Sequence, residues 1–163
     1  MILDKYFRRP VLYDYLISLV VAIILFVVYS KGIFNLPKDE RSLSMTSDLA
    51  NVGLTSAGFI LTLLTVLITF KSSSKINKKN YSDDDSLFDL FFSSELYFMT
   101  VRILKNCIKS LILISVIGFA LKLAIPKDFL KYVFFYNIFG LIIIALTLYR
   151  CLLVLTKVLK MQE

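Results

Sequence analysis

The sequence predicts an all-α, polytopic membrane protein with four transmembrane helices. Hydrophobic residues make up 58% of its 163 residues, whereas a soluble domain is typically about 45–50% apolar. The excess lies in runs of about 20 residues, which is the length that a helix needs to cross a bilayer. Four such runs and their connections fill residues 1–163, so we expect a single four-helix transmembrane domain.

The first span is predicted over residues 11–29, after a short basic arm. It contains one acid, Asp14, about one turn inside the apolar run. An ionisable residue within a membrane helix is a candidate functional residue by default, although an ion pair or contact with headgroup water would also account for it. Asp14 is therefore the candidate intramembrane acid of this chain.

The second span, predicted over residues 48–70, carries a line of polar and small residues at alternating steps of three and four. Thr46 or Ser47 is expected to cap the start of this helix. Heptad spacing places the whole line on one helix face, about 36 Å long. Lipid offers no hydrogen-bond partner, so we expect this face to turn toward protein or water. We call it the polar stripe, and it comprises Asp48, Asn51, Thr55, Gly58, Thr62, Thr65, Thr69 and Ser72.

Two interpretations of the polar stripe follow from its composition. In the first, it packs against a neighbouring helix, because small residues allow a close approach and hydroxyls can hydrogen-bond across it. In the second, several copies assemble in a ring and the stripe lines a water-filled pore, with Asp48 forming a carboxylate ring that favours cations. One copy has too few helices to enclose a pore, so the second interpretation requires a homo-oligomer.

Residues 71–105 are predicted to form a cytoplasmic loop with an amphipathic helical segment at its end. Apolar residues are frequent between Leu87 and Met99, but Asp89 and Glu95 make this segment a poor span. We interpret it as an interfacial helix, or as a cytoplasmic extension of the third span. The acids at residues 83–85 precede it and indicate a helix start, since their spacing matches no calcium loop.

The third and fourth spans are predicted over residues 106–125 and 132–155. The fourth carries a weaker line of polar and small residues, comprising Asn137, Gly140 and Thr147. We call this line the secondary packing stripe. It offers the polar stripe a partner within one protomer, in which case no pore would be needed.

The Lys and Arg residues are unevenly distributed between the two sides of the predicted membrane. Thirteen of the 19 fall in the N-terminal arm, the second loop region and the C-terminal tail. By the positive-inside rule, both termini are expected in the cytoplasm. We expect the basic face to hold anionic lipid headgroups, with a cytoplasmic protein, a nucleotide or an oligonucleotide as the alternative ligand. This candidate cytoplasmic basic face comprises Arg8, Arg9, Lys71, Lys75, Lys78, Lys79, Arg102, Lys105 and Lys109.

The sequence has few of the residues that catalysis or metal binding requires. It contains no His, which is the commonest general base and metal ligand. Its two cysteines, Cys107 and Cys151, cannot complete a tetrahedral zinc site. We expect them to be small buried thiols without a disulfide. No phosphate-binding, zinc-protease or hydrolase motif occurs, so we expect neither an enzyme nor a cofactor or metal.

The stretch from Asn51 to Phe59, running into Thr62–Thr65, resembles small four-helix bacterial membrane proteins of phage-defence operons. Spans rich in Leu, Ile and Phe add to the resemblance, which covers about one helix and transfers no functional residue. It implies an oligomeric effector or sensor that acts on membrane integrity.

Together, these features lead us to expect a homo-oligomeric protein of the bacterial inner membrane. It would conduct ions or permeabilise the membrane, in anti-phage defence. One alternative is a non-conducting membrane sensor or scaffold that recruits a cytoplasmic partner or an anionic ligand through its basic face. Another is a small transporter, for which Asp14 or Asp48 would be essential.

Overall fold

The computed structural model describes residues 10–73, 91–92 and 94–159. Every secondary-structure element in these ranges is helical. The elements are α2 (Pro10–Ser30), α3 (Asp39–Ser73), α5 (Glu95–Ala124), a 3-10 helix η1 (Lys127–Tyr132) and α6 (Val133–Leu159). Four of these helical segments are long and apolar enough to span a membrane, which confirms the predicted fold class at that level.

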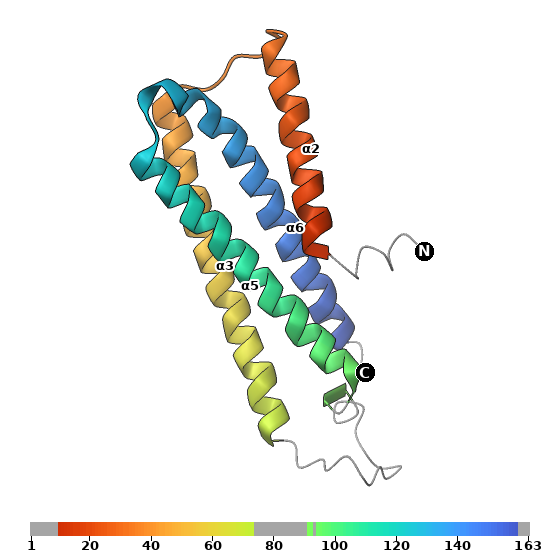
Figure 1. The fold of residues 1–163 in the computed structure, drawn as a ribbon. Helices are drawn as coiled ribbons and strands as arrows, with labels where there is room; N and C mark the ends of the chain where they lie inside the picture. Colours follow the sequence, from red (N-terminus) through yellow and green to blue (C-terminus); the bar gives the residue numbers. More distant parts are fainter. Residues whose placement is uncertain (1–9, 74–90, 93, 160–163) are drawn as a thin grey trace.

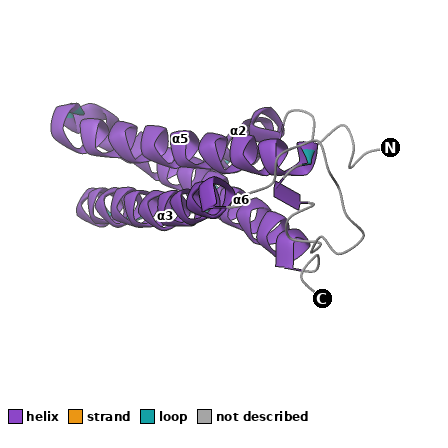
Figure 2. Cartoon of the chain, turned by 90° about the horizontal axis from the view of Figure 1, so that it is seen from below, coloured by secondary structure: helices purple, strands orange, loops and turns teal. Residues whose placement is uncertain are grey.

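The four long helices form an elongated bundle in which each runs opposite to the one before it (Figure 1). The most extensive contact is between α3 and α5, which lie side by side in both Figure 1 and Figure 2. α6 packs against α2, α3 and α5, whereas α2 lies at the edge of the bundle and contacts mainly α6. α3 and α6 therefore run in the same direction along the bundle.

α3 begins nine residues before the predicted span, at Asp39 instead of at residue 48. Pro37 precedes it in the loop, and the first helical hydrogen bond runs from the Ser42 amide to the Lys38 carbonyl at 3.1 Å. Asp39 and Glu40 occupy the first turn, where negative charge is favourable. Thr46 is consequently an interior helical residue and not a cap, contrary to the sequence-based expectation.

α5 also extends beyond the predicted span, because it starts at Glu95 instead of at residue 106. The amphipathic segment is interpreted from the sequence either as an interfacial helix or as an extension of the third span. Its described part from Glu95 onward is continuous with the rest of α5, as the second interpretation predicts. Phe91 and Phe92 are buried beside it, with ring centroids 6.1 and 5.6 Å from that of Tyr97. The acids at residues 83–85 lie outside the described residues.

The core of the bundle runs along one face of α5. Leu104, Leu111 and Ile114 on this face are at most 1% exposed, and they recur at the spacing that keeps residues on one side of a helix. Gly53 of α3 lies so close to α5 that an added β-carbon would overlap the Ser115 hydroxyl and lie 3.4 Å from the Leu111 carbonyl oxygen. The absence of a side chain at this position is what allows α3 and α5 to approach each other closely.

Aromatic contacts join the end of α2 to the start of α6. Phe26 and Tyr29 of α2 lie with ring centroids 5.4 and 5.9 Å from that of Phe135. Phe34, just after α2, lies 6.1 Å from Phe134. Such ring pairs contribute about 0.5–1.5 kcal/mol each beyond area burial, so they hold this end of α2 against the bundle.

Replacing Gly53 with Val is expected to lower the free energy of unfolding of the protomer by about 1–3 kcal/mol, the usual cost of overpacking. The matched control is Gly58→Val on the same helix, where an added β-carbon meets no atom within 4 Å. The control should change stability by less than about 0.5 kcal/mol. Unfolding in mixed micelles checks both variants, and equal stabilities would contradict the close packing of α3 on α5.

Candidate functional site

All eight residues of the polar stripe are exposed on the folded protomer. The face of α3 that packs on α5 and α6 is a different one, and it includes Ala50, Gly53, Ala57, Ile60 and Leu64. The protein contacts of the stripe must therefore come from beyond the described part of one chain. A second copy, water or lipid is left as its neighbour.

Three hydroxyls in the C-terminal half of the polar stripe are bonded within α3 itself. Thr62 donates to the Gly58 carbonyl oxygen at 3.1 Å. Thr65 donates to the Leu61 carbonyl oxygen and Thr69 to the Thr65 carbonyl oxygen, each at 2.9 Å. Because each donor is satisfied four residues back, its oxygen lone pairs are the part left to face a neighbour. These side chains can line a polar surface without requiring a partner donor or acceptor.

The three residues of the secondary packing stripe of α6 are buried. The Asn137 side-chain oxygen accepts a hydrogen bond from the Thr46 hydroxyl at 2.8 Å, and its amide nitrogen donates to the Ser42 carbonyl oxygen at 2.8 Å. An added β-carbon at Gly140 would come within 2.6 Å of Leu49, and Thr147 is fully buried. The α3 partners of Asn137 and Gly140 thus lie outside the polar stripe. The hydrogen bonds and the close contact at these two positions therefore do not involve residues of the polar stripe.

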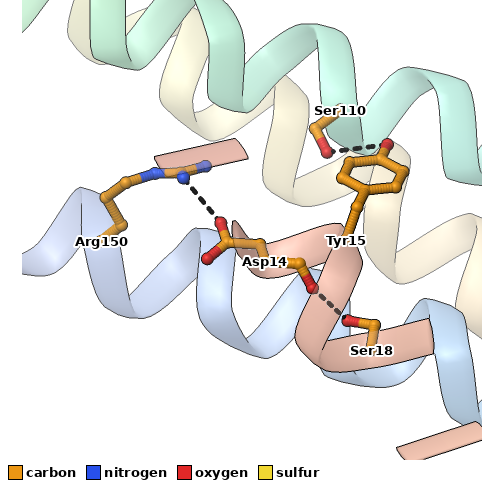
Figure 3. Close-up of polar contacts among 5 residues, drawn as sticks. All are labelled: Asp14, Tyr15, Ser18, Ser110 and Arg150. Carbon is orange, nitrogen blue, oxygen red and sulfur yellow. Dashed lines mark hydrogen bonds and ion pairs between the residues drawn. The ribbon is translucent and has the colours of Figure 1, made fainter. Parts of the chain in front are cut away.

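A buried ion pair joins the N-terminal part of α2 to the C-terminal part of α6 (Figure 3). The Arg150 guanidinium Nη1 donates to Asp14 Oδ2 at 2.6 Å, and each side chain is only 1% exposed. Asp14 and Ser18 are the buried residues of α2. Because two charges are removed from water here, their pairing must offset a desolvation penalty of several kcal/mol per ion. The ion pair sets where α2 docks on the bundle.

Hydrogen bonds around the ion pair reinforce this docking. The Ser110 hydroxyl of α5 donates to the Tyr15 hydroxyl at 3.1 Å, which links α2 to a second helix. The Ser18 hydroxyl donates to the Asp14 carbonyl oxygen at 2.7 Å. Cys107 and Cys151 are both buried, as expected, and their thiols lie within hydrogen-bonding reach of each other.

Arg150 is the functional candidate that the sequence analysis missed, since it counted this residue only as the first basic residue of the tail. A signal was present. Asp14 is the sole acid of the first span, and Arg150 is the sole basic residue between Tyr132 and Thr156. In the predicted topology, both lie near the ends of spans on the same side of the membrane. An isolated acid and an isolated base at one depth predict a buried pair.

The candidate basic face is described only in part. Arg102, Lys105 and Lys109 are exposed along one side of α5, as their spacing predicted. The Lys71 ammonium instead lies over two rings of the α5 extension, 4.2 Å from the Tyr97 centroid and 3.9 Å from that of Phe98. This cation–π contact ties the end of α3 to α5. The remaining members, Arg8, Arg9, Lys75, Lys78 and Lys79, lie outside the described residues.

Among the residues that the structure describes, no group of three or more His, Cys, Asp or Glu side chains is placed to hold a metal ion. Comparison with known proteins finds no matching family model, no matching curated protein and no matching solved structure. The bundle's own contacts and exposed faces are therefore the basis for a functional proposal.

Replacing Arg150 with Met is expected to lower the free energy of unfolding by about 3–5 kcal/mol, because it leaves the Asp14 carboxylate buried without its counter-charge. The matched control is Arg102→Met, which removes an exposed arginine and should cost less than about 0.5 kcal/mol. Reversible unfolding in mixed micelles measures both.

The double variant Asp14→Leu with Arg150→Met should recover most of the loss, since both charges are then absent. If the Arg150 single variant is as stable as the Arg102 control, the pair does not hold α2 in place.

Proposed function

We propose that this chain is a multi-pass protein of the bacterial inner membrane that assembles with copies of itself through α3 and conducts ions or permeabilises the membrane. The observation that carries the proposal is the exposure of the whole polar stripe on the folded protomer. The hydroxyl protons of Thr62, Thr65 and Thr69 are bonded within α3. The Asn51 amide and the outward-facing threonine oxygens would still be poorly solvated by lipid alone, and a second copy or a water-filled path relieves that cost.

The geometry of the stripe favours conduction over packing alone. It extends for about 36 Å, more than the roughly 30 Å of a hydrocarbon core. The hydroxyl protons of Thr62, Thr65 and Thr69 are committed to backbone carbonyls, so their oxygen lone pairs face outward. A ring of such oxygens attracts cations. The opposite face of α3 is already buried against α5 and α6, which leaves the stripe free to face a symmetry axis.

The setting of this activity follows from the sequence. The excess of Lys and Arg in the N-terminal arm, the second loop region and the C-terminal tail supports cytoplasmic termini. The resemblance to membrane proteins of phage-defence operons supports a role in anti-phage defence, where opening a path through the membrane would stop growth of an infected cell.

The conduction proposal is tested by replacing Thr62 and Thr65 together with Val, which keeps their shape and removes their hydroxyls. Ion flux through proteoliposomes, or unitary conductance in planar bilayers, is expected to fall severalfold, because the pore would lose its polar lining. The matched control is Thr156→Val on α6, which removes an exposed hydroxyl with the same bond to the carbonyl four residues back, at 2.9 Å, but away from the stripe.

Protomer folding should be the same in all three proteins, since each hydroxyl is bonded only within its own helix. Unchanged flux and unchanged oligomer size in the double variant would exclude both a conducting and an assembling role for the stripe. Unchanged flux with a smaller oligomer would assign the stripe to packing.

A second candidate function is a membrane sensor or scaffold that binds an anionic ligand or a cytoplasmic partner at α5. The exposure of Arg102, Lys105 and Lys109 along one side of that helix favours it. Three cations on one face attract an anion and raise its local concentration, and this attraction grows with the charge of the anion.

Replacing Arg102, Lys105 and Lys109 together with Gln is expected to abolish binding of a labelled oligonucleotide to the detergent-purified protein. Binding of the parent protein should weaken as salt is raised, because exposed charges are screened. The control is the same number of substitutions at Lys122, Lys127 and Lys131, which lie in the last turn of α5 and in η1. No binding by the parent protein, or equal binding by both triple variants, would reject an anion site on α5.

A further inference from the structure

An open groove of about 310 Å3 lies between α3 and α6, beside the polar stripe. α3 contributes Met45, Asp48 and Val52 to its walls, and α6 contributes Ile138, Leu141 and Ile144. Asp48 is the charged member of this lining, and its carboxylate is exposed. The groove therefore combines an apolar wall with a single anionic group.

The position of that anionic group along the groove follows from the register of the two helices. Thr46 bonds to Asn137, Leu49 meets Gly140, and Ile144 would lie 3.6 Å from a β-carbon at Gly53. Each contact joins residues that are 91 positions apart, so α3 and α6 run parallel with a constant register.

Asp48 thus lies at the same level as the start of the α6 wall, and the apolar lining continues from there for about 9 Å toward Ile144. The groove is thus polar at the end where Asp48 lies and apolar at the end where Ile144 lies. A bilayer lipid has the same order of polarity along the membrane normal.

The polar groups near the mouth limit which lipid fits. Both side-chain polar atoms of Asn137 are already bonded to α3, so they are committed to the protein. The Asp48 carboxylate can only accept hydrogen bonds and attracts a cation. The single charge that lines the groove is therefore negative. A carboxylate at the mouth matches a headgroup that carries a hydrogen-bonding ammonium group.

We propose that this groove binds an acyl chain of a phospholipid whose headgroup carries a primary ammonium, with the Asp48 carboxylate as the partner of the ammonium group. An anionic headgroup is disfavoured there by the like charge of Asp48. The proposal requires that α3 and α6 span the membrane, and it does not require conduction. It assigns Asp48 to the lipid, whereas the conduction test relies on Thr62 and Thr65, so either proposal can fail while the other stands.

The test uses the absence of tryptophan from the sequence. Leu141→Trp places a single fluorophore at the groove, and Val20→Trp places one on the exposed side of α2 as a control. Each protein is reconstituted in phosphatidylcholine vesicles that contain either phosphatidylethanolamine or phosphatidylglycerol brominated in the upper part of the acyl chain. Bromine quenches the fluorescence of a tryptophan that it contacts.

Quenching at Leu141→Trp is expected to show about a two- to fivefold preference for the ethanolamine lipid, the strength of a single exposed ion pair. Quenching at Val20→Trp should be equal for the two lipids. Adding Asp48→Asn should remove the preference at the groove. Adding Asp39→Asn, which removes an exposed acid from the first turn of the same helix, should leave it intact.

Three outcomes would overturn the proposal. Equal quenching by both lipids in the Leu141→Trp protein, or a preference that survives Asp48→Asn, would show that the groove does not select an ammonium headgroup. Quenching weaker than at the α2 control with both lipids would show that a second copy of the chain covers the groove. Met45→Trp, at the mouth, provides a second reporter whose result must agree if the larger ring at residue 141 disturbs the fold.

Discussion

Helix association in a bilayer cannot draw on the hydrophobic effect, because lipid tails are as apolar as the side chains that they contact. Four helices of this bundle are long and apolar enough to span a bilayer, and each pair of long helices in contact shares at least one hydrogen bond. Asp14 and Arg150 join α2 to α6, Ser110 and Tyr15 join α5 to α2, and Asn137 joins α6 to α3. The remaining two pairs are joined by the bonds from Tyr136 to the Ile114 carbonyl and from Lys122 to Ser47. Polar contacts therefore set the position of each helix, and apolar side chains fill the space between them.

The docking of α2 shows how far this constraint reaches. α2 is the most apolar of the four helices and yet the least buried, since only 11% of the residues in its most apolar stretch are buried in the bundle. Its two buried side chains, Asp14 and Ser18, are polar, whereas most of its large apolar side chains are exposed. In water this arrangement would be inverted. It is consistent with a helix whose apolar surface lies against lipid and whose ionisable group is enclosed by protein.

Threonine has two different roles in this chain, and α3 contains both. Thr46 is fully buried and donates to Ser42 and Asn137, so it belongs to a contact between helices. Thr62 is exposed and donates to its own helix. The difference lies in which face of α3 each residue occupies. One side of the helix packs against other helices and another side is exposed, so residues of the same type meet different surroundings. The groove beside Asp48 lies where these two faces meet.

The sequence alone determined the four apolar helices, because the length and composition of an apolar run decide whether it can cross a bilayer. It also identified the heptad line on α3, the acid at Asp14 and the packing line on α6, since spacing along a helix is a local property. It did not reveal that Asp39, Ser42 and Thr46 belong to α3, because the apolar run begins only near Val52. The hydrogen bonds that join Ser42 and Thr46 to the rest of the bundle involve Asn137, 91 or more positions away. It also missed Arg150 as the partner of Asp14, which lies 136 positions earlier. Only tertiary structure decided which face of α3 is buried, because that depends on the close approach of α5 at Gly53 and of α6 at Gly140, which spacing within one helix does not encode.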